Sequence, residues 1–232
     1  MGRRLFGGQS HTKVRDPLST IQHNIPALHV KTGVQKDEGP GMMSKVSMDD
    51  HHDAVAEHHR FSGVTVGEEV WQLDHLEAFA MRVALELSPG KPIDIDIVVL
   101  FSNHCFTRGL TSGEVVDEAL IVMDGSEKRV LDAERYALSR HYLPGLILEL
   151  PTRHILVADP TRPNFVTFEL PPVAPGAEPV RYAVFFEVKK DSVRRRRMLL
   201  RVQSAYILDK PSKRLLKADK MRFAVILKRA YG

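Results

Sequence analysis

The sequence has only one cysteine, Cys105, and no long hydrophobic run. A single cysteine excludes a disulfide framework and a cysteine-rich zinc site, and it favours a reducing compartment such as the cytosol. No apolar stretch reaches the length needed to cross a bilayer, and no apolar segment of signal-peptide length follows the basic start. We therefore predict a cytoplasmic protein that does not associate with a membrane.

Glycine-rich motifs for phosphate binding are also absent. The chain contains neither G-x-x-x-x-G-K-[ST] nor G-x-G-x-x-G, and it lacks the G-x-S-x-G elbow of many serine hydrolases. Nucleotide-cofactor enzymes and serine hydrolases are therefore disfavoured. We predict no cofactor and no bound metal.

Positive charge is concentrated toward the C-terminus. The segment from Arg181 to the end holds sixteen of the 33 Lys and Arg residues but only four of the 29 Asp and Glu residues. A basic segment of this kind favours partners rich in phosphate, through counterion release and long-range attraction. RNA or another polyanion is the expected partner, and an acidic protein is the alternative.

Residues 1–60 show no sustained hydrophobic period, and we predict that they form a disordered leader. Within them, the stretch "DDHHDAVAEHH" brings four histidines close together in sequence: His51, His52, His58 and His59. Such a cluster could bind a metal, but an exposed polar tract is favoured because no apolar residues would hold the ligands in place. Residues 61–232 are predicted to form a single domain, with a possible internal boundary near residue 131.

The pattern within residues 61–232 predicts an α+β fold, in which a strongly bent antiparallel sheet packs on one main helix. The stretch "KPIDIDIVVLF" alternates like a half-buried strand, and "EALIVMDGSEKRVL" predicts a hairpin that turns at Asp124-Gly125. Asp132 is placed to cap a helix that Pro144 should kink or divide. Four further strands are predicted between residues 153 and 208, and a last one over 221–231.

The stretch "VFFEVKKDSVRRRRMLLRVQSAYIL" predicts a hairpin whose turn carries Arg194, Arg195, Arg196 and Arg197. If the two strands pair, Glu187 lies beside Arg201 or Gln203 on one face of the sheet. A carboxylate, a guanidinium and an amide on one face could bind and cleave a phosphodiester. An exposed cross-strand ion pair with a solvated turn is at least as good an explanation.

A metal nuclease is a weaker alternative for the same strand. In this alternative Asp159 and Glu187 hold a divalent ion, and Lys189 orients the attacking water. The stretch "FSNHCFT" offers His104 as an acid or base near neutral pH, although a hydrogen-bonded structural histidine is favoured. Cys105 is expected to be buried and structural.

The order of "FSNHCFT", "DAERYALSR", "NFVTFEL", "YAVFFEVKK" and "LLRVQSAYILD" resembles bacterial stationary phase growth adaptation proteins over roughly residues 71–231. The C-terminal half, through "YAVFFEVKK", "RVQSAY" and "RFAVILKRAY", also resembles the barnase–EndoU–colicin–RelE class of ribonuclease toxins. That class implies a helix followed by an antiparallel sheet, and RNA cleavage without a metal.

The toxin resemblance implies roles for particular residues. Glu187 or His104 would be the base, and Arg201 would stabilise the phosphate. Ser204 or Tyr206 would contact the phosphate or the leaving oxygen, yet in a regular strand both lie on the face opposite Arg201. A bulge must therefore intervene, or these two residues belong to the core.

The arginine turn would hold RNA without reading its sequence, together with Lys189. We therefore expect an RNA-directed protein of stress or growth control, and the toxin resemblance implies a metal-independent endoribonuclease. The alternative is a non-enzymatic module that binds nucleic acid or a protein partner through its basic sheet.

Overall fold

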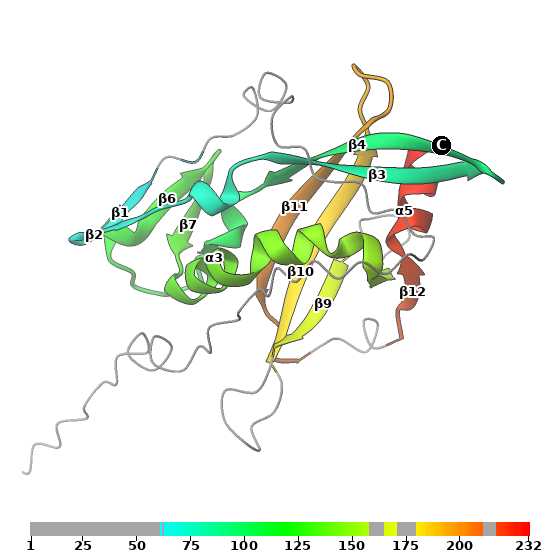
Figure 1. Ribbon diagram of the computed structural model, residues 1–232. Helices are drawn as coiled ribbons and strands as arrows, with labels where there is room; N and C mark the ends of the chain where they lie inside the picture. The colour runs from blue at the N-terminus through cyan, green and yellow to red at the C-terminus, as the bar shows by residue number, and fades with distance from the viewer. Residues whose placement is uncertain (1–60, 62, 158–164, 171–179, 211–216) are drawn as a thin grey trace, which may run out of the picture. The chain divides into compact units, whose positions relative to one another are not determined.

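The computed structural model describes residues 61, 63–157, 165–170, 180–210 and 217–232. All of them belong to one compact unit, Asp37–Gly232. The predicted leader, with its four histidines, lies outside the described residues, as do Asp159 and the segment 171–179. The predicted α+β class and the strongly curved sheet are confirmed (Figure 1).

The main sheet has seven strands in the order β12-β8-β9-β10-β11-β4-β3. In chain order these strands are β3 (Phe79–Ser88), β4 (Lys91–Phe101), β8 (His154–Val157), β9 (Phe165–Leu170), β10 (Val180–Lys190), β11 (Arg197–Ile207) and β12 (Asp219–Arg222). Neighbouring strands are antiparallel, except that β11 and β4 run parallel. The β10–β11 hairpin therefore lies at the centre of the sheet.

Two smaller sheets precede the long helix in the chain. The first is a hairpin of β1 (Val64–Val66) and β2 (Glu69–Trp71), followed by the short helix η1 (Asp74–Leu76). The second has three strands, β5 (Thr107–Gly109), β7 (Glu127–Leu131) and β6 (Ile121–Asp124). The short helices η2 (Asn103–Cys105) and η3 (Glu118–Leu120) precede β5 and β6. The predicted turn at Asp124-Gly125 is confirmed, because β6 and β7 pair across it.

Two α-helices pack on the same face of the main sheet. Helix α3 (Ala133–Leu148) begins after Asp132, whose side chain accepts a hydrogen bond from Arg135 N, so the predicted cap is confirmed. The helix continues through Pro144 and is not divided there. The short helix η4 (Leu150–Thr152) follows it. Buried side chains of α3, α5 (Phe223–Tyr231), β10 and β11 form one hydrophobic core.

The prediction of a last strand over 221–231 is wrong for most of its length. Only Met221 and Arg222 belong to a strand, β12, and residues 223–231 form helix α5. The apolar residues Phe223, Ile226 and Leu227 recur at helical spacing, and all three are buried on one side of α5. No helix within the described ranges combines the length and apolar character needed to cross a membrane.

Candidate active site

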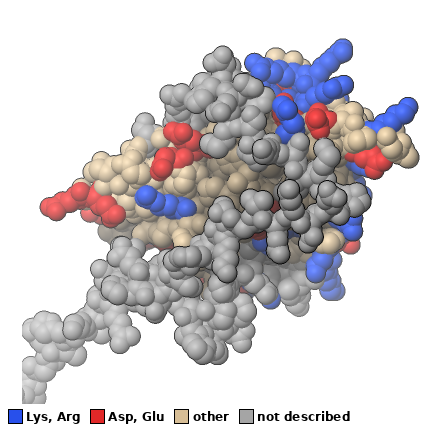
Figure 2. Space-filling view, in the orientation of Figure 1, with Lys and Arg blue, Asp and Glu red and all other residues tan. Residues whose placement is uncertain are grey.

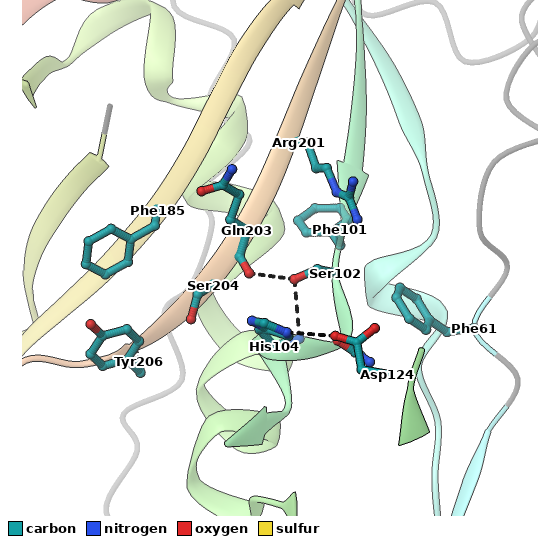
Figure 3. Close-up of a pocket in the computed structure, with 11 residues that line it drawn as sticks. Phe61, Phe101, Ser102, His104, Asp124, Phe185, Arg201, Gln203, Ser204 and Tyr206 are labelled. Carbon is teal, nitrogen blue, oxygen red and sulfur yellow. Dashed lines mark hydrogen bonds and ion pairs between the residues drawn. The ribbon is translucent and has the colours of Figure 1, made fainter. Parts of the chain in front are cut away.

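A pocket of about 630 Å³ opens where the C-terminal end of β4 meets β11 and the β6–β7 hairpin (Figure 3). Five polypeptide segments contribute to it, and they are separated in the sequence. Its lining residues are Phe61, Phe101, Ser102, Asn103, His104, Asp124, Phe185, Arg201, Gln203, Ser204 and Tyr206. Four of the five predicted catalytic residues are therefore in one place, and Glu187 is the exception.

A β-bulge brings the β11 residues together. The pairing of β11 with β10 skips Gln203, which is the extra residue. Because one extra residue reverses the alternation of faces, Ser204 and Tyr206 point to the same side as Arg201. The sequence required either a bulge or a core position for these two residues, and the structure contains the bulge. The pocket is therefore lined by four side chains of β11: Arg201, Gln203, Ser204 and Tyr206.

His104 is held at the pocket wall from both its backbone and its ring. Ser102 caps η2 by accepting a hydrogen bond from His104 N at 3.3 Å, and its hydroxyl donates to Gln203 O at 2.6 Å. The ring atom Nε2 lies 2.8 Å from Oδ2 of Asp124. This imidazole–carboxylate pair therefore joins the short η2 turn to the β6–β7 hairpin.

The His104–Asp124 pair has a defined polarity. The hydrogen bond from His104 holds the pKa of Asp124 below its usual value, so the carboxylate is ionised near neutral pH. An ionised carboxylate only accepts hydrogen bonds, and therefore Nε2 of His104 carries the hydrogen. In the neutral ring, Nδ1 is left to accept a proton. In the view of Figure 3, His104 lies between Asp124 on one side and Ser204 and Tyr206 on the other.

Arg135 of α3 contacts both the backbone of His104 and the ring of Tyr206. Its guanidinium donates to the carbonyl oxygens of Thr107 at 2.8 Å and His104 at 3.3 Å, and it lies 4.7 Å from the ring centroid of Tyr206. The Tyr206 ring also stacks on Phe185, with centroids 5.4 Å apart. Burial lowers the pKa of Arg135, but an arginine remains charged near neutrality.

Glu187 lies directly opposite Arg201 in the sheet, as one of the two predicted registers requires. Its carboxylate, however, forms an ion pair with Lys189, with 2.9 Å between Oε2 and Nζ. Glu187 is not among the residues that line the pocket. Of the two bases suggested by the sequence, His104 is therefore the better placed.

The four arginines of the turn do not share one environment. Arg197 is the first residue of β11, and its Nε donates to Oδ2 of Asp191, which is itself buried. Arg194, Arg195 and Arg196 are exposed. Arg197 therefore holds the turn together, and the other three arginines keep their side chains in solvent.

Cys105 is fully buried, as expected. Burial raises the pKa of its thiol to about 12, so it is not a nucleophile near neutral pH. In the part of the chain that the structure describes, no three His, Cys, Asp or Glu side chains are grouped so that they could bind a metal ion. The metal-nuclease alternative depends on Asp159, which is outside that part.

The arrangement is suited to proton transfer beside an anion. His104 can take a proton at Nδ1, Asp124 fixes its tautomer, and Arg201 supplies positive charge. A Ser–His–Asp hydrolase would need Ser204 to donate to His104, but the described residues show no such hydrogen bond.

Sequence reasoning missed Asp124 as a site residue. It appeared only as the first residue of a predicted turn, twenty positions after His104. No local pattern links the two, because their approach depends on how the three-stranded sheet meets β4. Phe101 and Phe185 were missed because single aromatics in apolar stretches are usually core residues. Phe61 was missed because no motif surrounds it in the sequence.

Comparison with curated proteins and with solved structures gave no match. The model of the YjaZ family matches residues 63–231. These residues include every side chain that lines the pocket except Phe61. Because the match spans well over half of the sequence, the chain belongs to the YjaZ family.

Proposed function

We propose that this protein is a metal-independent endoribonuclease that acts on single-stranded RNA. The observation that carries the proposal is the 2.8 Å contact between His104 Nε2 and Asp124 Oδ2 in the same pocket as Arg201. An oriented imidazole beside a guanidinium supplies the base and the cation that phosphodiester cleavage through a ribose 2′-hydroxyl needs.

The reaction assigns one step to each group. Nδ1 of His104 removes the proton of the 2′-hydroxyl, and the O2′–P bond forms. Arg201 stabilises the charge that develops on the phosphorus oxygens. The P–O5′ bond then breaks, and a hydroxyl of Tyr206 or Ser204 donates a proton to the leaving 5′-oxygen. The products are a 2′,3′-cyclic phosphate and a free 5′-hydroxyl.

The lining of the pocket supports RNA as the substrate. Four aromatic side chains and the amides of Asn103 and Gln203 surround the His104–Asp124 pair. Proteins that recognise single-stranded RNA commonly place bases against aromatic rings and contact the base edges with polar groups. The volume of about 630 Å³ lies within the range of ordinary small-ligand pockets, so it is suited to one or two nucleotides.

A cytosolic location and a role in stress or growth control complete the proposal. The reduced, buried Cys105 supports the location, and the resemblance to stationary phase growth adaptation proteins supports the role. A non-enzymatic RNA-binding protein is the second candidate, because the three exposed arginines of the β10–β11 turn would bind phosphate without any catalysis. An acidic protein partner would also fit these arginines.

Labelled RNA incubated with the protein in excess EDTA tests the proposal. We expect cleavage by the wild type and a loss of about 10²–10⁴-fold in rate for His104→Gln, the usual contribution of a general base. His141→Gln is the matched control, because His141 is exposed on α3 and should leave the rate unchanged.

Three other results would point elsewhere. RNA that is bound but intact would support the non-enzymatic alternative. Cleavage abolished by Glu187→Gln and unaffected by His104→Gln would move the base to Glu187. Cleavage that requires a divalent ion would contradict the metal-independent mechanism.

A further inference from the structure

The turn between β10 and β11 is held in one conformation by Asp191. This carboxylate is 7% exposed, and it accepts hydrogen bonds from Val193 N at 2.7 Å, from Arg194 N at 3.3 Å and from the Arg197 side chain. Burial alone would raise the pKa of Asp191, but these hydrogen bonds lower it below its usual value. The turn is therefore anchored by an ionised group.

Two backbone hydrogen bonds fix the turn further. Asp191 N donates to Arg197 O at 3.0 Å across the hairpin, and Asp96 N donates to Arg196 O at 2.9 Å from the neighbouring strand β4. The backbone of the turn is thus hydrogen-bonded to β11 and to the neighbouring strand β4. A turn held in this way loses little conformational entropy when it binds a partner.

Arg196 has a left-handed backbone conformation, with φ of 59°. Glycine or asparagine usually occupies such a position, because a Cβ atom is unfavourable there. A turn that only connected two strands would be more stable with glycine. An arginine at a strained position is an observation from which a functional role can be inferred.

The three exposed arginines stand at the tip of the hairpin that also builds the pocket. Figure 2 shows Lys and Arg side chains gathered at the upper right of the view, where Figure 1 places this turn. Arg201 follows Arg197 by four residues, about 13 Å along an extended strand. Arg201 lines the pocket, so β11 leads from the turn to the pocket that also holds the His104–Asp124 pair.

Nearby acidic groups compensate little of this charge. Asp191 is paired with Arg197 within the turn, and Asp96 of β4 is paired with Arg82, with 2.8 Å between Oδ1 and Nε. Asp94 is exposed on β4 and reduces the local charge by one. A net positive tip remains.

We infer that Arg194, Arg195 and Arg196 form a preformed binding site for backbone phosphates of single-stranded RNA, beyond the nucleotides held in the pocket. The inference rests on the proposed function, because it gives the substrate of the same site a path along β11. Guanidinium groups pair well with phosphate oxygens and do not read bases. The turn therefore sets the length of RNA that binds well, while the pocket sets where it is cut.

Two substrates distinguish binding at the turn from binding in the pocket. A dinucleotide occupies the pocket alone, whereas an RNA of about ten nucleotides reaches the turn, within the usual span of single-strand sites. The test variant replaces all three arginines by serine. The matched control replaces Lys217, Lys220 and Arg222 by serine, which removes the same charge from an exposed region at the β12 edge of the sheet.

Binding is measured by fluorescence anisotropy with a 2′-O-methyl RNA of about ten nucleotides, which cannot be cleaved. We expect the arginine variant to bind about tenfold or more weakly, with a salt slope reduced by about two, and the control to differ less from the wild type. Dinucleotide cleavage should stay within about twofold. The melting temperature of each variant shows whether it is folded.

Equal binding of the long RNA by the wild type and the arginine variant would overturn the inference. This holds whether or not the dinucleotide is cut, since binding is measured without catalysis. Weaker binding combined with no dinucleotide cleavage by the wild type would support the arginine site and contradict the ribonuclease. An equal loss of affinity in both variants would also overturn the inference, because charge alone would then explain it.

Discussion

At the scale of single residues, the proposed chemistry depends on Asp124 because it fixes the tautomer of His104. Asp124→Asn retains the size of the side chain but loses the charge that holds the hydrogen of His104 on Nε2. We expect RNA cleavage to fall by about 10²–10⁴-fold while RNA binding is retained. Single-turnover cleavage and anisotropy measure the two quantities separately.

Asp94→Asn is the matched control for that prediction. Asp94 is exposed on β4 and does not line the pocket, so the single-turnover rate of the Asp94→Asn variant should not fall below that of the wild type. A similar loss in both variants would mean that net charge, and not the contact with His104, determines the rate.

His75 provides a second prediction, and it concerns stability. Burial lowers the pKa of His75 from 6.5 to about 4, and Nε2 lies 2.9 Å from the hydroxyl of Ser139. The hydroxyl of Ser139 donates to Tyr136 O, so it is free to accept from the neutral imidazole. The folded state thus favours neutral His75, and the stability that this provides is present above pH 6.5 and is lost as pH falls toward 4.

We expect His75→Gln to remove part of this pH dependence, because glutamine can donate to Ser139 and does not titrate. Between pH 7 and about 4.5, the wild type should lose about 1–2 kcal/mol more free energy of unfolding than the variant, a value reduced because solvent reaches the ring. Urea unfolding at the two pH values measures this difference. Parallel pH profiles would contradict the prediction, because they would mean that the pKa of His75 is the same in the folded and unfolded states.

At the scale of elements, the β10–β11 turn carries a cost in stability that can be measured. Arg196→Gly relieves the left-handed conformation of the backbone, and we expect a gain of about 0.5–1 kcal/mol after allowing for the entropy that glycine loses on folding. Thermal or urea unfolding measures this gain. Among the described residues other than glycine, Arg196 alone has a positive φ, so Arg195→Gly should not gain stability. Equal effects of the two substitutions would contradict the strain.

Individual elements were predictable to different degrees. The alternation in β4 and the turn at Asp124-Gly125 are local signals, and both match the structure. Helix α5 was mistaken for a strand because "RFAVILKRAY" is short and apolar, and such runs do not separate the two periods clearly. The parallel pairing of β11 with β4 has no local signal, because it joins strands about a hundred residues apart.

At the scale of the whole molecule, the site could be predicted only in part. His104, Arg201, Ser204 and Tyr206 were all identified from the sequence, but the sequence could not decide whether they meet. They meet because of a bulge and a parallel strand pair, which depend on tertiary packing. Asp124, the hydrogen-bond partner of His104 that sequence reasoning did not identify, belongs to the separate three-stranded sheet.

Some arginines of the molecule are hydrogen-bonded within the fold, and others are exposed on its surface. Arg135 and Arg197 form hydrogen bonds within the fold, and Arg194–Arg196 are exposed. A count of basic residues near the C-terminus therefore overstates the charge that a partner meets. The exposed fraction of each side chain, which only the structure gives, makes the distinction.

Cleavage of two matched oligonucleotides in EDTA tests the central claim most directly. One is RNA throughout, and the other has a 2′-deoxy nucleotide at the position that the wild type cuts. We predict that the RNA is cut to a 2′,3′-cyclic phosphate by the wild type, that the deoxy-substituted strand stays intact at that position, and that His104→Gln cuts neither. Cleavage of the deoxy-substituted strand at that position, or no cleavage of the RNA, would contradict a ribonuclease that works through His104 and the 2′-hydroxyl.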